Sequence, residues 1–185
     1  QFAGAFLAGA VLYGLLAPTI SAYELAHGIV RGTEASIDTA RMFGEFYPNP
    51  GDSMAVVSMP LAMVAEGFGT FLLVMFIFAL TEGCNVGRPS DTMAPVFIGL
   101  SVSSIICLIA PLTQAGLNPA RDFGPRLVSW LAGWGEVAFP DACCGGFFFV
   151  YILAPILGGA VAAYALTYVI EPLIKQGDGS CECEK

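Results

Sequence analysis

Residues 111–126 read PLTQAGLNPARDFGPR and place an arginine and an aspartate in the middle of a strongly apolar chain. Asn118 can cap a helix that starts at Pro119, because proline presets the helical φ and lacks only an N–H that the first turn leaves unpaired anyway. The segment 119–131 is about half as long as a membrane crossing needs. A short irregular approach and a half-length helix are typical of a discontinuous membrane element, tolerated only inside protein or beside a wet cavity. We therefore expect a solute pathway here.

The composition indicates an all-α membrane protein. The 185 residues are 56% hydrophobic and only 12% charged, and a soluble domain usually carries about twice that charged fraction. Each of four apolar stretches approaches or exceeds the ~17–20 residues of a crossing: 1–17, about 55–80, about 93–111 and about 147–170. The first residue is not methionine and no charged leader precedes the first stretch, so we expect the chain to begin inside a longer protein.

Charge and cysteine usage exclude several other classes of protein. The net charge of −8 comes mostly from loops and the tail, and no basic stripe offers itself to nucleic acid. The six cysteines do not have a zinc-ligand spacing, so we expect neither a resident metal nor a cofactor. Cys181-Glu-Cys183 could bind a soft metal or simply belong to an acidic tail. The apolar segments contain no Ser–His or Cys–His pair, so an enzyme is not expected.

The segments around the crossings carry simpler signals. Residues 18–54 hold the chain's one histidine and are expected to form a long loop outside the membrane, with a short helix over 35–45. Trp134 is expected at a membrane interface, and Glu171-Pro172 is expected to end the last crossing.

Glu66 lies within the second apolar stretch, where a carboxyl group is expensive and needs a partner inside the bundle. It could relay protons. It could also be a fixed acceptor for backbone N–H groups of the broken segment. We favour the acceptor, because the neighbouring crossings hold no second titratable group to pass a proton on.

The half-helix itself indicates which solutes can pass. Its N-terminus presents unpaired N–H groups and about half a positive elementary charge, which repels cations. Arg121 adds donors on nearly the same face as Asn118, and the irregular residues 113–117 can supply carbonyl acceptors. Donors and acceptors together suit hydroxyl groups. Asp122 could be a structural partner of Arg126 at i+4, or only an acid placed on the helix dipole.

The stretch from Asn118 to Arg126, followed by Trp130-Leu-Ala-Gly-Trp134-Gly, resembles the second asparagine-proline-alanine (NPA) box of the aquaporin family, and most of all its glycerol-facilitator (aquaglyceroporin) branch. The resemblance extends over about 1–173. It implies a right-handed helical bundle, of which this chain would hold crossings three to six and the second re-entrant half-helix. It also implies a multi-pass homotetramer in the lipid bilayer of a plasma or bacterial inner membrane, with 18–54 outside and both 81–92 and the acidic tail 174–185 inside the cell.

The function implied is a passive channel for glycerol, water and other small neutral solutes that excludes ions and protons. Expected pore and selectivity residues are Arg121, Asn118, Ala115, Ile106, Gln114, Gly116 and Leu117; Pro119 and Ala120 start the half-helix, and Glu66 and Asp122 support it. Ala115 stands where a facilitator has a filter aromatic, Ile106 where it has glycine, and Tyr151 where it tends to have proline. The alternatives are therefore a water-selective or a broad small-solute aquaporin (urea, ammonia, metalloid acid), and, beyond these, a poorly conducting structural protein or a membrane enzyme.

Overall fold

The computed structural model describes residues 1–52, 54–83 and 85–177. Within these ranges, four helices are long and apolar enough to cross a membrane: Phe2–Ala26 (α1), Met59–Thr81 (α3), Ala94–Thr113 (α4) and Phe148–Ile174. The last of them combines a π-helical turn Phe148–Leu153, α6 (Ala154–Ala165), a second π-helical turn Leu166–Ile170 and the start of α7 (Glu171–Gly177). The half-helix α5 spans Pro119–Ser129.

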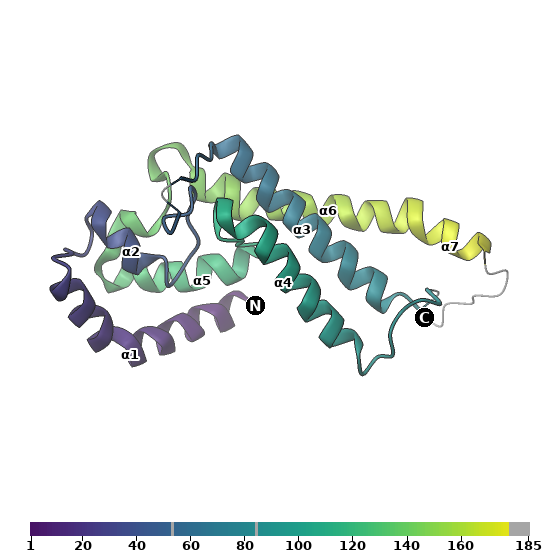
Figure 1. Cartoon of the computed structure of the whole chain (residues 1–185), viewed down its shortest axis with the longest axis horizontal. Coiled ribbons are helices and arrows are strands. Elements are labelled where there is room, and N and C mark those ends of the chain that lie inside the picture. The colour runs from purple at the N-terminus through teal and green to yellow at the C-terminus, as the bar shows by residue number, and fades with distance from the viewer. Residues whose placement is uncertain (53, 84, 178–185) are drawn as a thin grey trace.

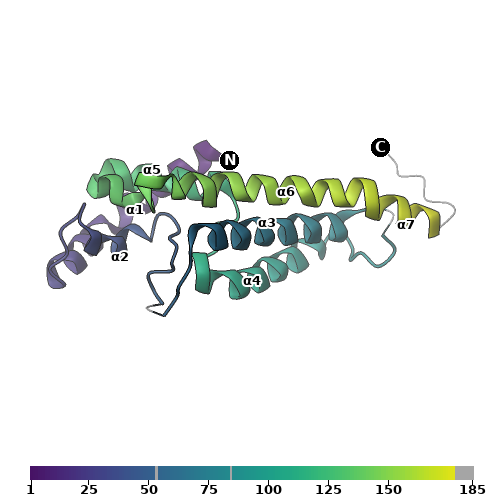
Figure 2. The same cartoon turned by 90° about the horizontal axis from the view of Figure 1, so that it is seen from above.

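The helices form two groups. In Figure 1, α1, α2 and α5 lie together in one half of the molecule, and α3, α4 and α6 in the other. Figure 2 shows α3 between α6 and α4, and the main helix contacts are indeed those of α3 with α6, α3 with α4, and α1 with α5. The chain's first residue lies near the start of α5, where the two groups meet.

Helices α3 and α6 approach closely because glycines face each other. A Cβ atom on Gly158 would overlap the backbone carbonyl oxygen of Gly67, and a Cβ on Gly67 would lie 3.3 Å from the carbonyl oxygen of Ala154. Between membrane helices, such close backbone contact replaces the hydrophobic effect as the source of stability.

Helix α1 is longer than expected. The sequence placed its end at residue 17, before Pro18, but the helix continues through that proline to Ala26. The continuation carries Glu24 to Arg31, with Nη2 2.7 Å from Oε2. Arg31 also donates to the Ala132 carbonyl (3.0 Å), so this ion pair ties the end of α1 to the turn after α5.

Two further helix boundaries differ from expectation. In place of a helix over 35–45, a 3₁₀ turn Glu34–Ser36 leads into a short α2 (Ile37–Ala40), because the residues after α2 are bound to α5 instead. Pro172 does not end the last crossing. It is the second residue of α7 and follows a π-helical turn, where the ordinary hydrogen-bond ladder is already interrupted and a missing N–H is tolerated.

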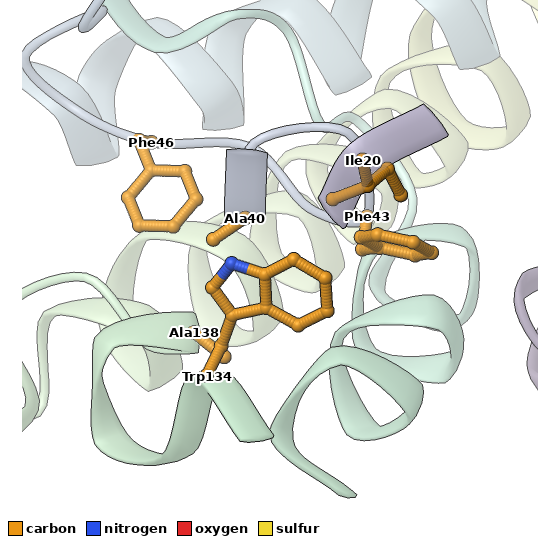
Figure 3. Packing of buried hydrophobic residues seen from close by; sticks show 6 residues of the cluster. All are labelled: Ile20, Ala40, Phe43, Phe46, Trp134 and Ala138. Carbon is orange, nitrogen blue, oxygen red and sulfur yellow. The ribbon is translucent and has the colours of Figure 1, made fainter. Parts of the chain in front are cut away.

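Trp134 is buried and not at an interface, so that prediction was wrong. It ends the π-helical turn Trp130–Trp134 that prolongs α5, and it packs in the cluster of Figure 3. Its indole N–H donates to Thr39 Oγ1 (3.0 Å), and the Arg31 guanidinium lies 3.9 Å from its ring centroid. These partners hold the segment after α1 on the end of α5. Cys181 and Cys183 lie outside the described residues.

Candidate functional site

The start of α5 is built by an abrupt change of chain direction. Helix α4 ends at Thr113, and Gln114, Ala115 and Leu117 then adopt left-handed φ values between 55° and 64°. Asn118 returns to an extended conformation, and its Oδ1 accepts hydrogen bonds from the backbone N–H groups of Ala120 (3.0 Å) and Arg121 (3.3 Å). Pro119 and Ala120 are therefore the first helical residues, with a side-chain cap that satisfies two otherwise orphaned donors.

Glu66 holds this turn in place from α3. Its fully buried carboxylate accepts from the Thr113 hydroxyl (2.6 Å) and from the backbone N–H groups of Gly116 (2.9 Å) and Leu117 (2.7 Å). The backbone N–H groups of Gly116 and Leu117 lie between two helices and have no helical acceptor, so a carboxylate from another element accepts from them. The geometry is that of the acceptor favoured from the sequence rather than of a proton relay.

Several expected pore residues pack against, or hydrogen-bond to, other parts of the protein. The side chains of Ala115 and Leu117 are buried against Ala65 and the α4 isoleucines. Gln114 Oε1 accepts from the Phe46 backbone N–H (2.9 Å). Ile106 on α4 is 41% exposed, whereas its neighbour Ile105 is buried, and the structure does not group Ile106 with the other site residues.

Tyr151 supports the turn instead of facing a pathway. Its hydroxyl donates to the Thr113 carbonyl (3.0 Å), and its ring lies so close to Gly116 that an added Cβ would be 2.7 Å from a ring carbon. The aromatic residue in place of a facilitator's proline thus packs behind the broken segment.

Arg121 meets a carboxylate that sequence reasoning missed. Its guanidinium forms an ion pair with Glu45, whose side chain is 11% exposed, whereas that of Arg121 is 53% exposed. Both side chains border a cavity of about 330 Å³ that is lined by α1, by α5 and by the loop that leads into α3. Burial raises the pKa of Glu45, although Arg121 opposes the rise. A carboxylate thus balances the positive charge at the start of α5.

Asp122 and Arg126 form a buried pair that positions Glu45. Arg126 Nη2 lies 2.8 Å from Asp122 Oδ1, and the two side chains are 1% and 0% exposed. The pair also binds both backbone groups of Glu45. The Glu45 N–H donates to Asp122 Oδ1 (2.7 Å), and the Glu45 carbonyl accepts from Arg126 Nη2 (2.6 Å). Of the two roles considered for Asp122, the structure shows the partner of Arg126.

Sequence reasoning missed Glu45 because 76 residues separate it from Arg121. The one local signal is the adjacent Gly44, where a Cβ atom would lie 2.6 Å from the Arg126 guanidinium carbon. A side chain at this position would push the loop off α5.

Comparison with known proteins identifies the family. Residues 1–168 match the model of the major intrinsic protein family. The chain belongs to this family. It is 41% identical over 170 residues to the glycerol uptake facilitator protein of Escherichia coli, covering 92% of this chain and 58% of the relative. The corresponding protein of Pseudomonas aeruginosa is 38% identical over 184 residues, covering 100% and 63%. The propanediol uptake facilitator PduF of Salmonella typhimurium is 38% identical over 170 residues, covering 92% and 62%.

A solved structure shares the fold. The aquaglyceroporin from Plasmodium falciparum superposes with a TM-score of 0.71 at 24% identity, covering 95% of this chain and 64% of that one. The chain thus spans about three fifths of the length of the relatives it matches, and it has the helical arrangement of this family.

Proposed function

We propose that the full-length protein is a passive channel for glycerol, water and other small neutral solutes, and not an enzyme. The observation that carries this proposal is the ion pair of Arg121 and Glu45 on the wall of a cavity, one turn inside a half-helix capped by Asn118. The names of the facilitators that resemble this chain support glycerol as the solute.

Arg121 and Glu45 together can satisfy a hydroxyl group, which both donates and accepts hydrogen bonds. The Arg121 guanidinium supplies N–H donors, and the Glu45 carboxylate supplies acceptors, at a mouth that is partly desolvated. A polyol can exchange its water hydrogen bonds for these, whereas a cation also meets the positive end of α5. We propose that the carbonyl groups of 113–117, rather than the buried side chains of Ala115 and Leu117, continue the pathway, with Ile106 on its apolar side.

The solute range depends on what replaces the aromatic ring of a typical facilitator filter. Ala115 is small and buried, so the filter lacks a flat carbon surface from this position. The polar Glu45 lies beside Arg121 instead. This arrangement keeps a broader small-solute channel as the second candidate, with urea as its diagnostic solute.

Orientation and assembly follow the family in this proposal. The segment between α1 and α3 faces outward, and 81–92 and the tail face the cytoplasm. The channel is a homotetramer in the cell membrane, with one pathway in each subunit.

Flux measurements test the function directly. The full-length protein is reconstituted in vesicles, and light scattering follows their volume after mixing with glycerol, urea or an impermeant sugar. We expect glycerol to equilibrate faster than in empty vesicles, and Arg121→Ala to admit larger solutes or ions. The matched control is Arg88→Ala, which removes another arginine that pairs with an acid, Asp91, and we expect it to leave the profile unchanged.

Two results would contradict the proposal. Glycerol flux equal to that of empty vesicles, together with fast water flux, would indicate a water-selective aquaporin. Absence of both fluxes would indicate a structural protein.

A further inference from the structure

The loop 139–146, between the end of α5 and the last crossing, brings two thiols and a carboxylate together. Cys143 Sγ lies 3.3 Å from Asp141 Oδ1 and 2.9 Å from Cys144 Sγ. The three potential ligand atoms all lie within 4.8 Å of one another, and all three residues are exposed. None of these residues takes part in the proposed pathway.

The loop backbone fixes this grouping. Asp141 and Gly145 have left-handed φ values of 50° and 75°, and the backbone N–H groups of Cys144 and Gly146 both donate to the Asp141 carbonyl (3.1 Å each). The chain therefore curls around that carbonyl, and the side chains of 141, 143 and 144 share one rim.

The carboxylate is also anchored from within the protein. The Tyr47 hydroxyl donates to Asp141 Oδ2 (3.4 Å), and the Tyr47 ring packs against a core cluster that includes Tyr151. A Cβ on Gly146 would overlap the Tyr47 hydroxyl, so glycine allows the loop to close on this residue. Carboxylates that bind a metal are usually held by a hydrogen bond from an outer residue, and the Tyr47 hydroxyl supplies one to Asp141.

We propose that Asp141, Cys143 and Cys144 bind a thiophilic divalent cation of the zinc class. Two sulfurs and one oxygen suit zinc, whereas calcium and magnesium require about six oxygen ligands. Tetrahedral zinc with bonds of about 2.3 Å separates two sulfurs by about 3.8 Å. The two exposed thiols are 2.9 Å apart, so on binding zinc they would lose their protons and separate to this spacing. The fourth position is left for water or another ligand. The proposal differs from the expectation of no metal, which rested on the spacing of the cysteines alone.

Binding of Zn²⁺ to the full-length protein tests the proposal. The background variant has serine at Cys84, Cys107, Cys181 and Cys183, which removes every other cysteine of this chain. In the presence of a phosphine reductant, titration calorimetry with Zn²⁺ alone should show one ion per chain. Ca²⁺ should show none.

Three further substitutions on this background locate the ion. The pair Cys143→Ser and Cys144→Ser should abolish stoichiometric binding, and Asp141→Asn should weaken it at least tenfold. Tyr47→Phe, which removes only the outer hydrogen bond, should weaken binding by about 10–100-fold. Unchanged elution on gel filtration shows that each variant is folded. Zinc binding that persists when both cysteines are serine, or no binding to the reduced background variant, would overturn the proposal.

Discussion

Replacing Arg126 by methionine tests whether the buried pair with Asp122 holds the loop on α5. Methionine keeps the apolar volume but leaves the Asp122 carboxylate, 0% exposed, without a counter-ion. Removing one partner of a buried ion pair costs about 3–5 kcal/mol, because the remaining charge stays buried without compensation. The carbonyls of Glu45 and Ala138 also lose their donor. We therefore expect Arg126→Met to lower the free energy of unfolding by at least about 3 kcal/mol.

A double-mutant cycle isolates the pair. Asp122→Asn alone should also destabilise, because it leaves the Arg126 cation buried. The double variant removes both charges, and we expect it to lose at least about 2 kcal/mol less than the sum of the single variants. The measurement is equilibrium unfolding in detergent micelles.

Arg88→Met is the matched control for this cycle. It breaks a pair with Asp91, whose side chain is 89% exposed, and should cost no more than about 1 kcal/mol. Strictly additive single variants, or an Arg126→Met cost as small as that of Arg88→Met, would refute the reasoning.

Two further predictions concern packing and pH. Gly158→Ala should destabilise the protein by about 1–3 kcal/mol because its Cβ collides with Gly67, whereas Gly99→Ala, with open space around it, should be neutral or slightly stabilising in a thermal unfolding series. Because burial raises the pKa of Glu45, its carboxyl takes up a proton at a higher pH than an ordinary glutamate, and acidification then releases Arg121 into the cavity. Glycerol flux into vesicles should therefore fall as the pH is lowered from 7 towards 5, and Glu45→Gln should give the low flux at every pH; an equally steep pH profile in that variant would contradict the role of this pair.

The half-helix is the part of the site that local sequence predicts best. Asn118 and Pro119 specify its start through interactions within three residues, so the cap could be predicted and the structure has it. Glu66 could be predicted as a buried acceptor because it lies inside an apolar run, where a charged group needs partners within the protein.

The predictions that failed concern residues whose conformation depends on distant contacts. The end of α1 depends on Arg31, which binds both Glu24 and the carbonyl of Ala132, 101 residues away. The burial of Trp134 depends on a contact with Thr39, 95 residues before it. A local pattern shows that a proline is unfavourable inside a helix, or that an indole N–H needs an acceptor. It does not show which residue elsewhere in the chain compensates for that cost.

By itself, the sequence determined a four-crossing helical membrane protein with a broken element and a capped half-helix, because apolar length and capping chemistry are local properties. Only the tertiary structure decided which groups surround that half-helix. It placed the loop between α2 and α3 so that Asp122 and Arg126 hold the backbone of Glu45, and this contact brings a carboxylate to Arg121. The balance of charge at the proposed mouth is therefore a property of the folded chain, since it joins residues that no local pattern connects.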